Sequence, residues 1–275
     1  ASTLSADCQT GSDANQRDDC RIVAVVNSVQ EFWTESLQGY EEAPTVFFTG
    51  QVSTGGCGGA TSASGPFYCP ADSLVYVDLS FFRELQTRFD SPGDFPIAYV
   101  IAHEVGHHVQ NVLGISEQAN REQSNDPDQA NEISVRVELQ ADCLAGVWAH
   151  TRYERGQSDP SKRLDDGDIE EALRAAGQIG DDTLQREATG RVRPEAFTHG
   201  TSEQRQRWFH KGFAEGSLTA GDTFSADRLY EAALPHIVVH NGPCPSLFVP
   251  VSPCRHIVVQ GRNPEHAMKF LHTAD

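Results

Sequence analysis

The chain has 275 residues, enough to bury a substantial hydrophobic core in one large domain or in two smaller ones. Aspartate and glutamate number 39 against 21 lysines and arginines, which gives a formal net charge of −18. A surface this acidic repels nucleic acids and anionic membranes, so neither is an expected partner. The sequence also contains no run of about twenty apolar residues, the length that a membrane-spanning helix requires.

Six of the seven cysteines form three local groups in polar stretches of the chain. They are Cys8 with Cys20, Cys57 with Cys69, and Cys244 with Cys254. Such spacing predicts disulfides that close short loops, although sequence alone does not fix the pairing, and disulfides persist in oxidising compartments. Cys143 lies in an apolar helical pattern and is expected to be a buried thiol. No C-x-x-C spacing favours cysteine-bound metal, so we expect an extracytoplasmic protein that is secreted, periplasmic or at the cell surface.

The chain begins without an initiator methionine and without a signal peptide. We expect that a leader or anchor has been removed, or that this chain starts downstream of one. Residues 1–17 are polar and predict a flexible N-terminal segment. Residues 18–37 carry apolar side chains at helical spacing and predict a core helix.

Two short segments after this helix have strand character. Residues 45–49 and 74–78 are rich in β-branched and aromatic side chains, and they are expected to pair. The intervening residues 50–65 are rich in glycine and serine but lack the G-K-[ST] of a phosphate loop, so nucleotide binding is not expected. A short helix is predicted over residues 80–89.

An apolar run over residues 95–113 predicts one buried helix, and this run contains the motif H-E-x-x-H. Residues four apart share a helix face, so His103 and His107 can offer imidazole nitrogens to one zinc ion. Glu104 lies about 100° around the helix, beside the metal, where a general base can take a proton from zinc-bound water. His108 also points about 100° away from the metal face and is expected to support the ligands or lie at the surface.

A second long helix, predicted over residues 128–153, supplies the ligand that the first one lacks. A catalytic zinc has three protein ligands and one open position, and the third histidine of metzincins is absent after this motif. Glu138 is far enough along the chain for an antiparallel return and is predicted to be the third ligand. Asp142 lies on the same helix face and is predicted to accept an N–H from His103. Asp142 or His150 as the ligand is the weaker alternative.

The chain changes character at about residue 225. Residues 157–200 predict short helices and loops, and Thr201 begins a capping box for a further helix. Residues 225–275 contain several prolines and two β-like runs, which are expected to pack on the body or pair as a hairpin. The sequence therefore predicts one domain over residues 18–224 and a divergent C-terminal appendage.

Several strings of this sequence, taken in order, resemble one known family. They are Cys20-Arg21, Val25 to Gln30, Phe48 to Val52, Gly65 to Asp72, Ala98 to Asn111, Glu138 to Cys143 and Phe197 to Arg205. Together they cover roughly residues 18–224 and resemble the bacterial "putative neutral zinc metallopeptidase" family, a gluzincin-like group. With the predicted elements, the resemblance implies an α+β, mainly helical, zincin-like fold with an active-site helix, a returning ligand helix and a small β-sheet or hairpin. It also implies one catalytic zinc on His103, His107 and Glu138, with Glu104 as the catalyst.

Two departures from the family pattern affect what can be carried over. The family often has cysteine where Gly221 stands, so Cys143 lacks one possible partner in this chain. Family members are commonly tethered by an N-terminal membrane helix, which this sequence does not contain.

These features predict a zinc-dependent endopeptidase in which Glu104 activates water for attack on a peptide carbonyl and then protonates the leaving amine. The oxyanion needs a further donor, for which His199 is the candidate because it precedes a helix start. A plain surface histidine is the alternative reading of His199, and Tyr153 is a weaker donor candidate. The expected partner is a peptide or protein that adds as a strand to residues 45–49 or 74–78.

Two other functions remain open from the sequence. The chain could be a zinc amidase that trims cell-wall peptides, or a zinc-bound scaffold or adaptor whose activity is lost or gated. The catalytic carboxylate at Glu104 argues against the scaffold, because a site without chemistry has no need of it.

Overall fold

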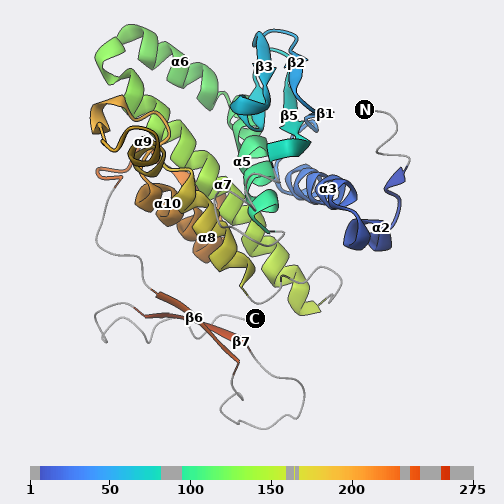
Figure 1. Cartoon of the computed structure of the whole chain (residues 1–275). Coiled ribbons are helices and arrows are strands. Elements are labelled where there is room, and N and C mark those ends of the chain that lie inside the picture. The colour runs from blue at the N-terminus through green and yellow to red at the C-terminus, as the bar shows by residue number, and fades with distance from the viewer. Residues whose placement is uncertain are drawn as a thin grey trace. The chain divides into compact units, whose positions relative to one another are not determined.

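The structure is a computed structural model in which two compact units are distinguished, residues 1–229 and residues 230–275 (Figure 1). It describes residues 7–81, 95–158, 164, 167–229, 236–241 and 255–260. The fold is mainly helical with small sheets, which confirms the predicted α+β class.

Helices make up most of the first unit. Among the described residues, the helices of more than one turn are α2 (Gly11–Gln16), α3 (Asp18–Ser36), α5 (Phe95–Val112), α6 (Ile115–Asn125), α7 (Ala130–Ser158), α8 (Asp168–Gln178), α9 (Asp181–Thr189) and α10 (Ser202–Glu215). Short 3₁₀ helices are η1 (Ser62–Ser64), η2 (Pro127–Gln129), η4 (Pro194–Ala196) and η5 (Leu218–Gly221). The predicted core helix, the motif helix and the returning helix are confirmed as α3, α5 and α7. The helix predicted over residues 80–89 lies mostly outside the described residues.

Helix α7 packs against both α5 and α10, and these three helices form the centre of the unit (Figure 1). Glycines bring the backbones into direct contact. A Cβ atom added at Gly212 would lie 1.9 Å from the carbonyl oxygen of Cys143, and one added at Gly146 would lie 2.0 Å from that of Phe209. Neither distance allows a side chain, so the two glycines fix the register of α10 on α7. Gly106 approaches Ala141 in the same way, with 3.1 Å from a built Cβ to the Ala141 carbonyl oxygen.

Three strands form a small mixed sheet beside α5. Its order is β1 (Thr45–Phe48), β5 (Leu74–Asp78) and β4 (Phe67–Cys69), with β1 parallel to β5 and β4 antiparallel to it. The predicted pairing of the first two segments is therefore confirmed. The suggestion that residues 74–78 offer an edge to substrate is wrong, because β5 is paired on both sides. A separate ribbon joins β2 (Gln51–Ser53) to β3 (Gly59–Thr61).

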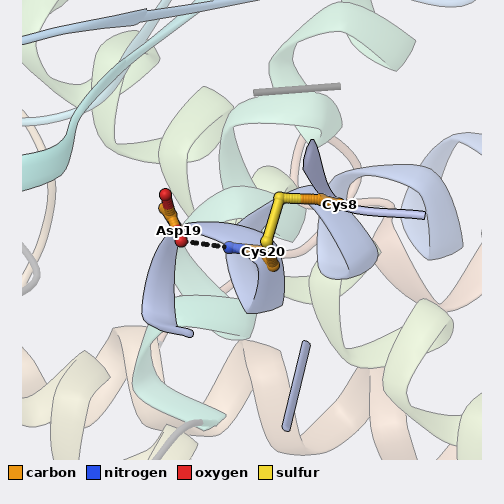
Figure 2. A group of neighbouring side chains, drawn as sticks. All are labelled: Cys8, Asp19 and Cys20. Carbon is orange, nitrogen blue, oxygen red and sulfur yellow. Dashed lines mark hydrogen bonds between the residues drawn. A yellow bond between two sulfur atoms is a disulfide. The ribbon is translucent and has the colours of Figure 1, made fainter. Parts of the chain in front are cut away.

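Two of the three predicted disulfides are confirmed. One joins Cys8 to Cys20 and so ties the segment before α2 to the first turn of α3 (Figure 2). The other joins Cys57 to Cys69 in β4. The third predicted bridge, between Cys244 and Cys254, lies outside the described residues.

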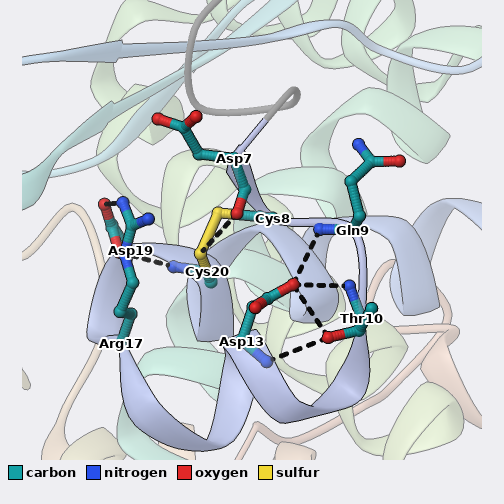
Figure 3. The surroundings of a disulfide bond; sticks show 8 residues. All are labelled: Asp7, Cys8, Gln9, Thr10, Asp13, Arg17, Asp19 and Cys20. Carbon is teal, nitrogen blue, oxygen red and sulfur yellow. Dashed lines mark hydrogen bonds and ion pairs between the residues drawn. A yellow bond between two sulfur atoms is a disulfide. The ribbon is translucent and has the colours of Figure 1, made fainter.

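Helix α2 falls within the stretch that the polar composition marks as a flexible segment. Thr10 caps it, since the Thr10 hydroxyl accepts the Asp13 backbone N–H and the Asp13 carboxylate accepts the Thr10 backbone N–H at 2.8 Å (Figure 3). This reciprocal capping box satisfies two of the donors that a helix start leaves open.

The second unit contains a pair of antiparallel strands, β6 (His236–Asn241) and β7 (Arg255–Gln260). The alternative that the two β-like runs pair with each other is thereby confirmed. None of the described helices has both the length and the apolar character needed to cross a bilayer.

Gly221 stands where the family often has cysteine, and its distance from Cys143 allows a test of whether the two positions can be joined by a disulfide. A Cβ built at Gly221 lies 3.6 Å from both the Cβ and the Sγ of Cys143, within the Cβ–Cβ range of disulfides. Burial raises the pKa of the Cys143 thiol to about 12, so the native thiol is unreactive. We predict that Gly221→Cys, folded under oxidising conditions, forms a disulfide with Cys143 and gains about 2–4 kcal/mol of unfolding free energy.

The measurements are mass spectrometry of non-reduced peptides that link positions 143 and 221, and denaturation with and without reductant. Gly221→Ser is the matched control because it adds a side chain of similar size without the bond. If Cys143 stays alkylatable after unfolding, or if reductant does not change the stability of the variant, the inferred proximity is wrong.

Candidate metal centre

Three side chains of the kind that ligate zinc meet between α5 and α7. The Nε2 atoms of His103 and His107 lie 3.2 Å apart. The carboxylate of Glu138 completes a triangle of side chains and faces each histidine with a different oxygen, with 3.2 Å from Oε2 to His103 Nε2 and 3.4 Å from Oε1 to His107 Nε2. The helical spacing of the histidines and the antiparallel return of α7 thus bring these residues together, as the sequence predicts.

Hydrogen bonds on the far side of each ring decide which nitrogen faces this triangle. His103 Nδ1 lies 2.8 Å from Asp142 Oδ1, and His107 Nδ1 lies 2.8 Å from Gln110 Oε1. Both partners are acceptors, so both Nδ1 atoms carry the proton in the neutral rings, and both Nε2 lone pairs face the shared point. Two lone pairs and a carboxylate directed at one point repel one another unless a cation lies between them.

The size of the triangle fits zinc. For tetrahedral zinc with bonds of about 2.0–2.1 Å, two neighbouring donor atoms are about 3.3 Å apart. The distance between the two Nε2 atoms, 3.2 Å, matches that value, and each of these nitrogens has one oxygen of the Glu138 carboxylate at a similar distance, 3.2 Å for Oε2 and 3.4 Å for Oε1. His103, His107 and Glu138 therefore provide a donor set of two imidazoles and one carboxylate that has the right spacing and leaves room for a fourth ligand.

The charge of the centre also fits a divalent cation. Among its described side chains, the carboxylates of Glu104, Glu138 and Asp142 outnumber the guanidinium of Arg205 by two. Burial disfavours a charged His103, yet Asp142 and Glu138 raise the pKa of its imidazole to about 10. Without a metal the centre therefore draws in a proton, which a metal ion would displace.

Asp142 connects the centre to two helices. It is fully buried and accepts the Tyr99 hydroxyl at 2.6 Å besides the His103 N–H. Arg205 binds it through both oxygens, with Nε to Oδ2 at 2.9 Å and Nη2 to Oδ1 at 3.0 Å. Although burial opposes ionisation, Arg205 and His103 lower the pKa of Asp142 below its usual range. Asp142 is thus an ionised carboxylate behind the ligand imidazole.

Two residues of this network are not predicted from the sequence. Arg205, on α10, is only 3% exposed and aligns Asp142. Gln110, on α5, is fully buried; its amide nitrogen donates to the Val137 carbonyl at 2.7 Å and to Gln140 Oε1 at 2.9 Å. Those two bonds orient its oxygen toward His107. Helical spacing could have identified Gln110 as a partner of His107, because residues three apart lie on the same face of a helix.

Glu104 lies beside the ligands, as its position in the motif predicts. Its Oε2 accepts the Tyr68 backbone N–H of β4 at 3.0 Å. Burial raises the pKa of Glu104, while the neighbouring His103 and His107 oppose that change. A buried carboxylate with a raised pKa is suited to accept and return a proton near neutral pH.

A cavity of about 370 Å³ opens onto the centre. Its polar lining includes Glu104, Glu138 and His199, and its apolar lining consists of Pro66, Phe67, Phe81, Val100, Ile179 and Leu184. His199 comes from the loop before α10 and lies 3.2 Å, through Nδ1, from Asp181 Oδ1. The structure therefore brings His199 to the cavity that holds the ligands.

The weaker candidates are not brought to this cavity. Tyr153 packs against Phe213, with ring centroids 5.9 Å apart. His150 lies 2.7 Å, through Nδ1, from the Phe213 carbonyl oxygen. His108 is buried rather than at the surface, and its Nδ1 lies 3.0 Å from the Tyr68 hydroxyl.

One other group among the described residues has the spacing of metal ligands: Cys8, Asp19 and Cys20. Its two sulfur atoms are bonded to each other, and Asp19 accepts the Cys20 backbone N–H (Figure 2). Asp19 also binds the Arg17 guanidinium (Figure 3). This group is a disulfide with a paired carboxylate, and we do not consider it a metal site.

The chain belongs to the "putative neutral zinc metallopeptidase" family, whose sequence pattern matches residues 2–224. It is 47% identical over 227 residues to "Uncharacterized protein Mb2605" of Mycobacterium bovis, covering 81% of this chain and 76% of that protein. It is 45% identical over 205 residues to "Uncharacterized protein YpfJ" of Escherichia coli K12, covering 73% of this chain and 69% of that protein. No solved structure shows significant similarity to the chain. The family implies zinc, and His103, His107 and Glu138 are a site that could hold it.

We predict that the purified chain binds one zinc ion and that His103→Ala, His107→Ala and Glu138→Ala each abolish stoichiometric binding. Gln110→Ala and Asp142→Asn keep the ligands but weaken their orientation, so zinc affinity should fall by about 10- to 100-fold. Metal content by mass spectrometry and competition with a chelating dye measure both effects. The exposed Glu117→Ala serves as the control, and unchanged zinc affinity in Glu138→Ala would remove Glu138 from the ligand set.

Proposed function

We propose that the protein is a zinc-dependent endopeptidase that hydrolyses peptide bonds with Glu104 as general base. The observation that carries the proposal is that His103, His107 and Glu138 have the spacing of zinc ligands. The buried Glu104 carboxylate lies beside them, and all four side chains line one cavity. Family membership supports the same class of activity.

The residues divide the chemistry among themselves. His103, His107 and Glu138 would hold zinc, which when bound lowers the pKa of a water molecule and polarises a substrate carbonyl. Glu104 takes the proton of the attacking water and returns it to the leaving amine. The Tyr68 N–H fixes one carboxylate oxygen of Glu104, so the other is the one available for proton transfer.

His199 is proposed as a donor to the oxyanion that forms on the substrate carbonyl. The Asp181 carboxylate accepts backbone N–H groups of Thr198, His199 and Gly200 at 2.7, 2.7 and 3.1 Å, and it also binds the ring at Nδ1. The hydrogen bond that His199 donates to the Asp181 carboxylate raises the pKa of His199, although partial burial opposes this. With Nδ1 engaged, Nε2 is the nitrogen that can serve the substrate, and in its protonated form it is a charged donor.

The proposed substrate is an extended peptide with an apolar side chain beside the cleaved bond. Six apolar residues of the cavity would surround such a side chain, namely Pro66, Phe67, Phe81, Val100, Ile179 and Leu184. Among the described residues that line the cavity, the one lysine or arginine is Arg205, and Asp142 already binds it, so within this described lining an acidic substrate side chain would lack a free guanidinium or ammonium partner. The net charge of −18 further disfavours acidic peptides.

Two disulfides support an oxidising, extracytoplasmic location, and we propose that the protein acts in such a compartment. A cell-wall amidase and a scaffold with lost or gated activity are the rival functions. Nothing in the lining of the cavity favours either over peptide hydrolysis.

The test compares wild type with Glu104→Gln on a peptide library, with zinc content measured for both. We expect equal zinc, cleavage beside apolar residues by wild type, and at least about a 100-fold lower rate in the variant because the base is lost. The exposed Glu117→Gln is the control and should match wild type. If wild type carries zinc but cleaves no peptide, the scaffold is favoured, and cleavage of cell-wall peptides alone would favour the amidase.

The role of His199 makes a prediction about pH. Because His199 acts protonated and Asp181 raises its pKa, activity should persist to higher pH than an unassisted histidine would allow. Asp181→Asn should therefore move the alkaline limb of kcat to lower pH, and His199→Gln should remove that limb and lower kcat by about 100-fold. Identical pH profiles in wild type and Asp181→Asn would show that His199 does not carry the oxyanion.

A further inference from the structure

Tyr68 lies in β4, the strand at the edge of the sheet, and both its backbone N–H and its side-chain hydroxyl form hydrogen bonds to α5. Its backbone N–H donates to Glu104 Oε2 at 3.0 Å. Its hydroxyl oxygen lies 3.0 Å from His108 Nδ1 and 3.0 Å from Asn111 Nδ2. Glu104, His108 and Asn111 are separated by four and three residues, so they form one face of α5.

The contact between His108 and Glu41 determines which group donates and which accepts in the hydrogen bonds around the Tyr68 hydroxyl. His108 Nε2 lies 2.7 Å from the backbone carbonyl oxygen of Glu41, an obligate acceptor, so Nε2 carries a proton. A neutral ring then accepts at Nδ1, and the Tyr68 hydroxyl donates to it. The Asn111 amide donates to the hydroxyl oxygen. In this arrangement each of the three hydrogen bonds joins a donor to an acceptor, and together they restrain the Tyr68 side chain.

The fixed side chain in turn fixes the peptide group that holds Glu104. Tyr68 belongs to β4, which is paired with β5 on one side only. In antiparallel pairing the N–H and C=O of one residue point to the same side. The Tyr68 N–H points to Glu104 and not to β5, so both backbone groups of this residue face away from β5, and the N–H is bound by α5 beside the cavity that Tyr68 lines.

We propose that Tyr68 is a positioning residue, which orients the Glu104 carboxylate through its backbone N–H and is itself held in place by His108 and Asn111. The proposal rests on the proposed function of Glu104 as the general base. The metal face of α5, at His103 and His107, is distinct from the face that holds Tyr68. Loosening Tyr68 should therefore disturb the base and leave the metal in place.

Tyr68→Phe removes the hydroxyl and keeps the ring. The matched control is Tyr76→Phe in the neighbouring strand β5, which keeps a buried ring and loses a hydroxyl that donates to Asp72 at 2.7 Å instead of contacting α5. In the zinc-loaded protein, we expect kcat to fall by about 10- to 100-fold in Tyr68→Phe, as for a catalytic group displaced by about 1 Å. KM and zinc content should stay unchanged, and Tyr76→Phe should keep the kcat of wild type.

A second measurement does not depend on catalysis. Hydrogen exchange at the Tyr68 backbone amide should be slow in wild type and in Tyr76→Phe, and faster in Tyr68→Phe and in Glu104→Ala, which lacks the acceptor. Asn111→Ala, a milder change, should lie between wild type and Tyr68→Phe in both measurements.

The kcat and hydrogen-exchange measurements test the proposed function and the positioning role of Tyr68 separately. If wild type cleaves no peptide but the exchange pattern is as expected, the proposed function fails and the positioning contact stands. If wild type is active and Tyr68→Phe keeps its kcat, or loses no more than Tyr76→Phe does, the positioning role is overturned. Loss of zinc in Tyr68→Phe would also overturn it, because the effect would then pass through the metal ligands.

Discussion

A carboxylate removed from water costs several kcal/mol unless its charge and its lone pairs are matched, and Asp142 is such a carboxylate. It is satisfied by Tyr99 and His103 from α5 and by Arg205 from α10, so one side chain of α7 binds both neighbouring helices. These bonds form only if the three helices are in register. The glycine contacts between α7 and α10 set that register, because the backbones touch where any side chain would intervene. The packing of these three helices and the orientation of the His103 imidazole therefore depend on each other.

Helix α5 is buried on nearly all sides because its faces contact different parts of the structure. One face carries His103 and His107 toward Glu138. A second carries Glu104 and His108 toward Tyr68 in β4. This explains why most of the segment is apolar and why it shows no polar stripe of a surface helix. Its few polar side chains lie only where another element provides a partner.

The sequence supports the prediction of contacts that follow from local spacing. The pair His103 and His107, the flanking Glu104, and Asp142 one turn after Glu138 are all matters of helical period, and the structure places them together. Arg205 could not be predicted this way, because its partner lies 63 residues away and only the packing of α10 on α7 brings them together. The order of the sheet was beyond prediction for the same reason, since strand propensity identifies β1 and β5 but does not say that β4 pairs with β5 and forms the edge beside Glu104.

The two ligand histidines have different partners, and the difference bears on the charge of the centre. Behind His103 stands the ionised Asp142, and behind His107 stands the neutral amide of Gln110. A carboxylate makes an imidazole a stronger donor to a metal, whereas an amide orients the ring without adding charge. With Arg205 opposing one of the three carboxylates, the buried excess is two negative charges, which one divalent ion cancels. A second carboxylate in place of Gln110 would leave an uncancelled buried charge, so a neutral acceptor at this position is what the electrostatics of a dication site require.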